Sequence, residues 1–121
     1  MKRILAVSTE PRLFDLLERN LSPYGFAIQV RPNADKLLHV IAQYQPEIVI
    51  IDFILNDVNG GAICHQLKLD PRTADIPVIL LSDYNDLERF NDKFGSAAII
   101  KRSELFPALT DELLHLCMPA H

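Results

Sequence analysis

The stretch Ile48-Val49-Ile50-Ile51-Asp52 decides the fold, because four consecutive β-branched apolar residues run directly into an acidic one. Such a run is typical of a central strand that is covered on both faces of a parallel sheet. The carboxylate of Asp52 is then expected at the carboxyl edge of the sheet, where ligands of such sheets bind. Asp52 is therefore the first candidate functional residue.

Apolar runs and helix-period segments alternate along the rest of the chain. Further strands are expected at 4–7, 26–30, 77–81 and 97–100. Helices are expected at 11–21, 37–44, 62–69, 84–94 and 105–116. Five strands alternating with five helices predict one α/β domain over residues 1–121, with helices on both faces of a parallel sheet. Right-handed crossovers then give the doubly wound, flavodoxin-like (βα)5 topology with strand order 2-1-3-4-5.

The composition argues against several classes of protein. Apolar residues make up 49% of the 121 residues, which is enough for a core without disulfides or metal. No apolar run reaches the roughly 18 residues of a membrane span, and the first residues lack the pattern of a signal peptide, so we expect a cytoplasmic protein with no membrane partner. The formal net charge of -4 argues against nucleic-acid binding by this domain. Cys64 and Cys117 match no ligand spacing and are expected to be buried thiols.

Polar residues follow three neighbouring strands where each is expected to end: Asp52, Ser82 and Lys101. A carboxylate in this place can act as a nucleophile toward a phosphoryl group. A serine hydroxyl can donate a hydrogen bond to a phosphoryl oxygen, and a lysine ammonium can pair with the carboxylate or with the phosphate. A purely structural alternative is a partly buried ion pair between Asp52 and Lys101 that stabilises the strand ends.

These segments resemble response-regulator receiver domains of the CheY-like superfamily. Residues 50–55 followed by Asn59-Gly60 are similar to the phosphoacceptor segment of that family. Residues 77–82, 99–101 and 2–7 are similar to its fourth, fifth and first strands, so the resemblance covers essentially the whole chain. It implies two-component signalling in which a histidine kinase phosphorylates Asp52, with Mg2+ beside it and with Ser82 and Lys101 on the phosphoryl group. It also implies a downstream effector as partner, and a homodimer through the face of the fourth helix, fifth strand and fifth helix.

The positions that hold magnesium in this family are changed. An acidic pair usually follows the first strand, whereas this chain has Ser8 and Thr9 there. Glu10 is the acid left to make a weak metal contact, and its position favours the start of the first helix instead. Magnesium prefers carboxylate oxygens, and the charges of Asp52 and Lys101 already cancel. We therefore expect no metal cofactor.

Further departures lie around the last two strands. Asp83 stands where the family has a small residue, and it either points inward against a phosphoryl group or turns outward to cap the fourth helix. Arg102 stands where a proline usually follows the lysine, which predicts a trans peptide bond before it. Ala98 takes the place of the switch Tyr or Phe, so the usual coupling to the output face is missing. The segment between Ser82 and Lys101 is shorter than usual by about one helical turn, which predicts a short fourth helix.

Alternative functions stay open. The departures favour a degenerate receiver, a non-enzymatic module that binds signalling proteins without phosphate. Retention of Asp52, Ser82 and Lys101 supports a working phosphoacceptor. A third alternative is a flavin-binding electron carrier on the same topology, although the loop at Ser8 and Thr9 has no glycine and the chain has no tryptophan.

Overall fold

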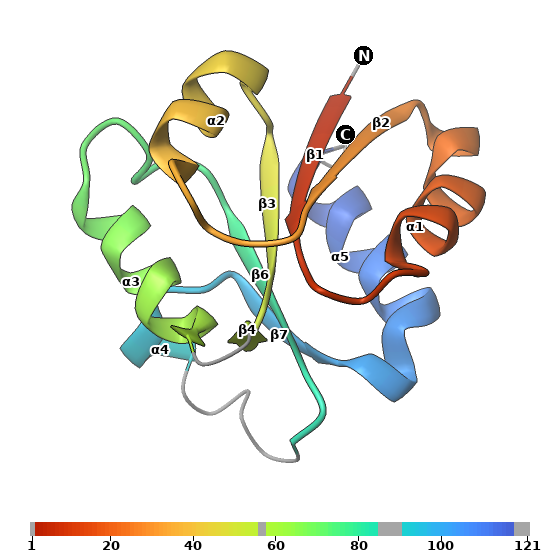
Figure 1. Ribbon diagram of the computed structural model, residues 1–121. Coiled ribbons are helices and arrows are strands. Elements are labelled where there is room, and N and C mark those ends of the chain that lie inside the picture. Colours follow the sequence, from red (N-terminus) through yellow and green to blue (C-terminus); the bar gives the residue numbers. More distant parts are fainter. Residues whose placement is uncertain (1, 56–57, 85–90, 118–121) are drawn as a thin grey trace.

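A five-stranded parallel sheet forms the centre of the computed structural model, which describes residues 2–55, 58–84 and 91–117 (Figure 1). The strands are β1 (Lys2–Val7), β2 (Phe26–Arg31), β3 (Ile48–Asp52), β6 (Val78–Ser82) and β7 (Ala98–Lys101). Their order in the sheet is β2-β1-β3-β6-β7. Because β4 and β5 lie outside this sheet, the order is the predicted 2-1-3-4-5.

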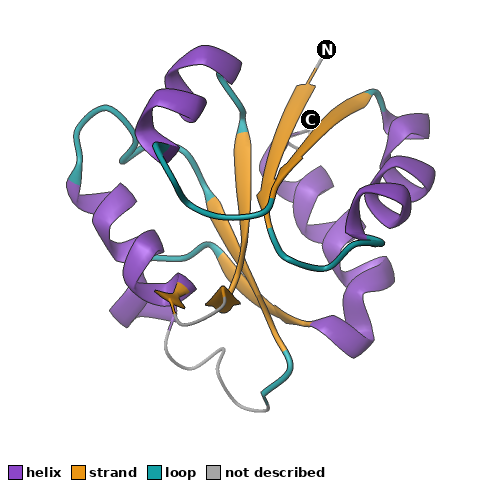
Figure 2. Cartoon of the chain, in the orientation of Figure 1, coloured by secondary structure: helices purple, strands orange, loops and turns teal. Residues whose placement is uncertain are grey.

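Helices cover both faces of the sheet (Figures 1 and 2). They are α1 (Leu13–Leu21), α2 (Leu37–Tyr44), α3 (Gly60–Leu69), α4 (Asn91–Phe94) and α5 (Leu105–Cys117), with short 3-10 turns at η1 (Ser22–Tyr24) and η3 (Arg102–Glu104). One face packs against α1 and α5, and the other against α2, α3 and α4. Among the described helices, none is long and apolar enough to cross a membrane.

The side chains of the central strands divide the core into two layers. Ile48 and Ile50 belong to the layer under α1 and α5, whereas Val49 and Ile51 belong to the layer under α2 and α3. All four are fully buried, as are their neighbours on β1. Because successive residues of a strand point to opposite faces, an unbroken apolar run is what a sheet covered on both sides requires. The interpretation of residues 48–51 as the central strand is confirmed.

Two segments of the structure differ from the secondary structure that the sequence predicts. The loop expected after β3 contains a small antiparallel hairpin of β4 (Ile54–Leu55) and β5 (Val58–Asn59). These strands are two residues each, too short for a periodic pattern to be seen. The fourth helix was expected at 84–94, and its described part, α4, covers four residues at the end of that range. Residues 85–90 of this prediction lie outside the described part of the chain.

Candidate functional site at the carboxyl ends of the strands

The strand register brings the predicted site residues to one edge of the sheet. Asp52 ends β3 and is paired in register with Leu81 on β6. Ser82 ends β6 and is paired in register with Lys101, which ends β7. Ser8 follows the last residue of β1, whose neighbour across the sheet is Ile51. The sequence thus placed Asp52, Ser82, Lys101 and Ser8 at the same edge, and the structure has them there.

Asp52 is buried and both of its carboxylate oxygens are engaged. Its exposed fraction is 1%. The Ser8 hydroxyl donates a hydrogen bond to Oδ2 over 2.6 Å and itself accepts one from the backbone N–H of Glu10 over 3.0 Å. Nη2 of Arg102 lies 3.0 Å from Oδ1. This second contact is an ion pair without hydrogen-bond geometry, because Oδ1 has no hydrogen-bond partner among the described residues.

Among the described residues, Arg102 and not Lys101 is the cation within ion-pair distance of Asp52. The predicted ion pair between Asp52 and Lys101 is therefore wrong in its partner. The Lys101–Arg102 bond is trans as predicted, since the cis bond in the described part of the chain is Phe106–Pro107. Arg102 begins η3 directly after β7, and its side chain is 28% exposed, so it reaches back over the strand ends.

The pKa of Asp52 is raised above its ordinary value. Burial is the largest cause, because removal from water disfavours the charged form. The hydrogen bond from Ser8, the charge of Arg102 and the backbone N–H of Thr9 act in the opposite direction. The effect of desolvation on the pKa exceeds the effects of these partners. The charged form of Asp52 is therefore less favourable in the folded state than in water.

Glu10 and Asp83 place two further carboxylates around Arg102. Oε2 of Glu10 lies 4.0 Å from Nη1, and Oδ1 of Asp83 lies 3.5 Å from Nε. The other oxygen of Glu10 accepts a hydrogen bond from the backbone N–H of Arg12, as expected of a residue at the start of α1. The side chain of Asp83 is 75% exposed and so turns outward beside Arg102. Its predicted role as a helix cap concerns residues 85–90, which lie outside the described part.

The remaining predicted residues have defined places but untested roles. Ser82 is buried, and its hydroxyl accepts a hydrogen bond from the backbone N–H of Tyr84 over 2.9 Å, which forms a tight turn after β6. Lys101 is half-buried at the end of β7. Ala98 is half-buried and packs against the layer under α1 and α5. Thr9 is exposed. Phosphoryl binding by Ser82 and Lys101 stays a prediction.

Gly60 packs α3 directly against the backbone of Asp52. A Cβ atom at Gly60 would lie 2.0 Å from the carbonyl oxygen of Asp52, and the backbone N–H of Gly60 donates to the Phe53 carbonyl over 2.6 Å. Only glycine allows such an approach of two backbones. Asn59 precedes it as the helix N-cap, and its side chain accepts a hydrogen bond from the backbone N–H of Ala62. The Asn59-Gly60 pair thus fixes the loop beside the candidate phosphoacceptor.

These residues do not fit a magnesium ion in the described arrangement. Ser8 and Thr9 offer hydroxyls where a dication needs carboxylates. The oxygens of Asp52 face the hydroxyl of Ser8 and the guanidinium of Arg102 instead. The described residues contain no group of three or more His, Cys, Asp or Glu side chains spaced to hold a metal ion.

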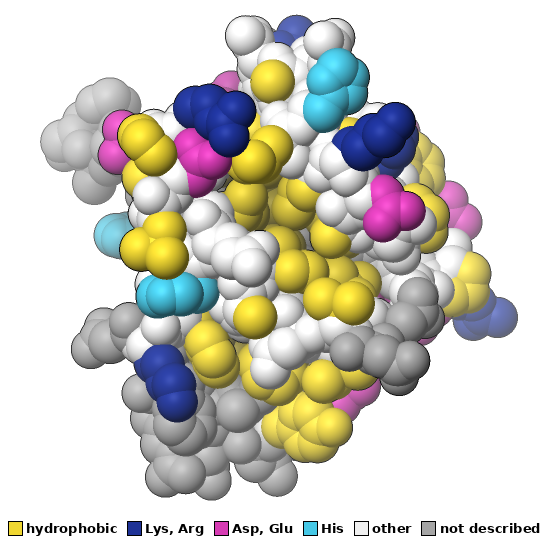
Figure 3. All heavy atoms as spheres, turned by 60° about the vertical axis from the view of Figure 1, so that its left-hand side comes forward, with side chains coloured by type: hydrophobic (Ala, Val, Ile, Leu, Met, Phe, Trp, Pro, Cys, Tyr) yellow, Lys and Arg dark blue, Asp and Glu magenta, His cyan; other side chains and the backbone are white. Residues whose placement is uncertain are grey.

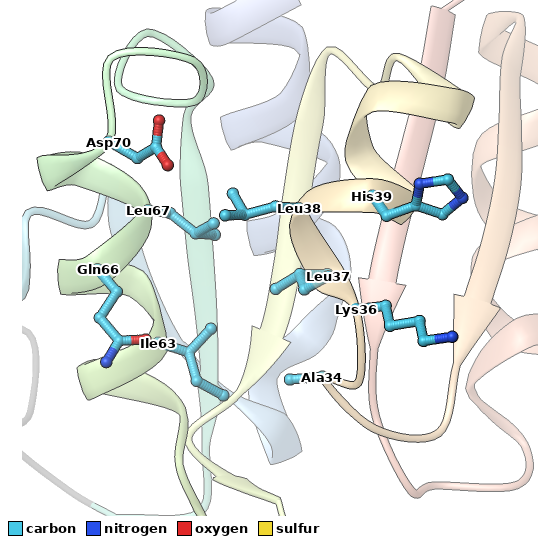
Figure 4. Close-up of a pocket in the computed structure, with 9 residues that line it drawn as sticks. All are labelled: Ala34, Lys36, Leu37, Leu38, His39, Ile63, Gln66, Leu67 and Asp70. Atoms are coloured by element: carbon cyan, nitrogen blue, oxygen red, sulfur yellow. The ribbon is translucent and has the colours of Figure 1, made fainter.

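Two of the hollows on the described surface lie beside this edge of the sheet and between α2 and α3, and Asp52 is not among the residues that line them. One of about 260 Å³ beside the site is lined by Phe53, Ile54, Leu81, Ser82, Asp83, Tyr84 and Arg102. The other, of about 290 Å³, lies between α2 and α3, where Leu38 and Leu67 point toward one another (Figure 4). Figure 3 shows hydrophobic side chains across this face, with charged and histidine side chains around them. Its carboxylate, Asp70, is paired with Arg72 over 2.7 Å, and Lys36 and His39 also line it.

Sequence reasoning missed two contacts of this site. It treated Ser8 as a lost metal ligand and not as a hydrogen-bond donor to Asp52. It treated Arg102 as a lost proline and not as a counter-ion. The signal for Arg102 was present, since a guanidinium one residue beyond the strand has the reach to fold back over the edge.

Comparisons with known proteins agree with this fold. The family model described as the response regulator receiver domain matches residues 4–99. The chain is 34% identical over 98 residues to the DNA-binding dual master transcriptional regulator RpaA of Synechocystis sp., which covers 81% of this chain and 41% of that protein. It is 29% identical to the transcriptional regulatory protein BaeR of Escherichia coli, over 66% of this chain and 32% of that one. The chain therefore spans about two-fifths or less of these curated relatives.

Solved structures share the fold. The signal receiver domain of a DNA-binding response regulator from Colwellia psychrerythraea superposes with a TM-score of 0.82 at 24% identity, covering 96% of this chain and 98% of that one. The response regulator TrrA of Thermotoga maritima, in complex with Mg2+ and BeF, gives 0.81 at 24% identity, with 96% and 99% covered.

Proposed function

Because the chain belongs to the response regulator receiver domain family, we propose that it is a receiver whose partner-binding surface works without phosphorylation of Asp52. Receivers of two-component response regulators are typically non-enzymatic signalling modules that interact with histidine kinases and effectors. In this chain the interaction would depend on the fold and its surface. No magnesium-dependent phosphoryl transfer to Asp52 would be needed.

The observation that carries the proposal is the state of the Asp52 carboxylate. A nucleophile must present a free oxygen to the phosphorus atom of its donor. Asp52 is 1% exposed, with one oxygen hydrogen-bonded to Ser8 and the other against Arg102. In-line attack by either oxygen would require the partner of that oxygen to be displaced, and no carboxylate pair follows β1 to bring a metal ion that could favour this step.

A working phosphoacceptor is the second candidate, because Asp52, Ser82 and Lys101 are all retained at the strand ends. Under that alternative Arg102 would move off Asp52 and pair with the phosphate, which an arginine fork suits. The two candidates differ in one observable, the covalent state of Asp52.

The partners proposed are signalling proteins: a histidine kinase or a downstream effector. The face of α4, β7 and α5 stays the predicted homodimer surface. Several relatives are transcriptional regulators about twice as long as this chain, so an effector or DNA-binding segment in the same polypeptide is part of this proposal.

The test is phosphorylation with a small-molecule donor. The protein is incubated with acetyl phosphate and millimolar Mg2+, and intact mass spectrometry follows the gain of a phosphoryl group, with Asp52→Asn as the matched control. We expect equal, background gains in both. A gain in the wild-type chain that Asp52→Asn abolishes would establish the second candidate instead.

A further inference from the structure

Arg102 gathers three carboxylates at the carboxyl edge of the sheet. Its three guanidinium nitrogens lie 3.0 Å from Asp52, 3.5 Å from Asp83 and 4.0 Å from Glu10. These acids come from separate segments: Glu10 follows β1, Asp52 ends β3 and Asp83 follows β6. One side chain thus joins three loops to the segment that leads into α5.

We propose that the guanidinium of Arg102 is a resident cation, which takes the place that a divalent metal ion would otherwise occupy among acidic loops. A guanidinium suits this role because it is permanently charged and its planar fork points nitrogens in several directions. A metal ion must be captured from solution, whereas this cation is part of the chain. The edge of the sheet is therefore held in one arrangement without a metal.

The geometry is that of one cation shared among several anions. Neither Oδ1 of Asp52 nor Nε of Arg102 has a hydrogen-bond partner among the described residues, although each lies within ion-pair distance of an opposite charge. A bidentate arginine–carboxylate pair would instead show two parallel hydrogen bonds to one acid. Arg102 therefore shares its charge among Asp52, Asp83 and Glu10 and forms a bidentate pair with none of them.

Charge balance supports the same role. The acids Glu10, Asp52 and Asp83 carry three negative charges, and Arg102 lies within ion-pair distance of each, which leaves two. Without Arg102 the same set would carry all three negative charges and would attract a dication more strongly. Arg102 therefore both lies among the acids and weakens their attraction for a metal.

This inference concerns the unphosphorylated chain and does not depend on the proposed function. A resident cation on Asp52 is compatible with a phosphoacceptor that releases it, and equally with one that never reacts. The experiment below uses no phosphoryl donor, so its failure is distinct from a failure of the proposed function.

The test measures how Mg2+ changes the melting temperature of the wild-type chain and three variants. Each protein is melted in millimolar MgCl2 and in NaCl of equal ionic strength. Arg102→Gln removes the cation, Arg102→Lys keeps the charge without the fork, and Arg72→Gln removes an exposed ion pair with Asp70 as the matched control. Comparison at equal ionic strength separates specific binding from screening.

We expect no Mg2+-specific change in the wild-type chain, in Arg102→Lys or in Arg72→Gln. Arg102→Gln should melt about 5–10 °C lower in NaCl and should regain part of this loss in MgCl2. If Arg102→Gln folds only in MgCl2, the proposal is equally supported. The proposal is overturned if Arg102→Gln melts like the wild-type chain, if it gains nothing from Mg2+ or fails to fold in either salt, or if the wild-type chain gains as much.

Discussion

The Ser8 hydroxyl donates a 2.6 Å hydrogen bond to Oδ2 of Asp52, which ties the end of β1 to the end of β3. Both residues are buried, so this bond replaces water that the carboxylate loses on folding. A position that usually supplies a metal ligand in this family thus supplies a hydrogen-bond donor to the neighbouring strand. Ser8 thus takes the place of a metal-binding carboxylate, and its hydrogen bond offsets part of the desolvation of Asp52.

Ser8→Ala should lower the free energy of unfolding by about 1–2 kcal/mol, because it leaves a buried carboxylate oxygen without its donor. Thr9→Ala is the matched control, since Thr9 is the exposed next residue and its change should stay within about 0.5 kcal/mol. Urea denaturation of the three proteins measures both values. Equal effects of the two substitutions would show that the Ser8 bond contributes nothing specific.

The sheet could be predicted from the sequence because its signals are local. The apolar runs at 4–7, 48–51 and 78–81 are continuous, and turn residues separate them from helix-period segments. Strand order then followed from general rules of connection and not from any one residue. The hairpin of β4 and β5 could not be predicted, since two-residue strands carry no period.

The site was predicted in its position but not in its pairing. The ends of β3, β6 and β7 could be located, so Asp52, Ser82 and Lys101 were placed correctly. The choice between Lys101 and Arg102 as partner of Asp52 depends on which of two adjacent side chains turns over the edge. Neighbouring residues of an extended chain point in opposite directions, and a one-residue error reverses the assignment.

Asp52→Asn should lower the free energy of unfolding by less than about 1 kcal/mol, or should raise it, because it removes a charge that burial disfavours.

Arg102→Gln should lower the free energy of unfolding by about 2 kcal/mol, since it leaves the charge of Asp52 buried and unpaired. The partial exposure of Arg102 keeps this loss below that of a fully buried pair. Adding Asp52→Asn to Arg102→Gln should recover most of the loss. A double-mutant cycle by chemical denaturation measures the coupling. Additive losses would contradict the pairing.

The raised pKa of Asp52 gives stability a specific dependence on pH. The folded state holds this proton more tightly than the unfolded state, so the Asp52 contribution falls as pH rises from the ordinary aspartate pKa through the raised one. The difference in unfolding free energy between the wild-type chain and Asp52→Asn, measured from pH 4 upward, should therefore move in favour of the variant. A difference that stays constant or moves the other way would show that the pKa is not raised.

Asp70 serves as the control, because its pKa is shifted in the opposite direction to that of Asp52. Hydrogen bonds from Arg72 lower the pKa of its carboxyl to about 2. Its contribution is therefore present above the ordinary aspartate pKa and is lost as pH falls through about 2. Asp70→Asn should remove stability at neutral pH and have a shrinking effect in acid, as measured by the same titration.

Gly60→Ala should destabilise the domain by about 3 kcal/mol or more, because the new Cβ would lie 2.0 Å from a backbone oxygen of Asp52 and neither backbone can yield cheaply. Gly25→Ala is the comparison, since its Cβ meets nothing within 4 Å and bears only the cost of a positive φ of 85°, about 1 kcal/mol. Thermal melts of both variants check the order. A smaller loss for Gly60→Ala than for Gly25→Ala would contradict the close contact of α3 with β3.

Beryllofluoride, a mimic of the acyl phosphate, tests most directly whether Asp52 is closed to phosphoryl chemistry. Amide spectra of the ¹⁵N-labelled protein are recorded with millimolar Mg2+, and then with Mg2+ and beryllofluoride together. We predict that the amides of Asp52, Ser82 and Lys101 keep their positions in both spectra, because Ser8 and Arg102 already engage the carboxylate. Saturable shifts of these three amides, absent from Asp52→Asn, would contradict the account and identify a working phosphoacceptor.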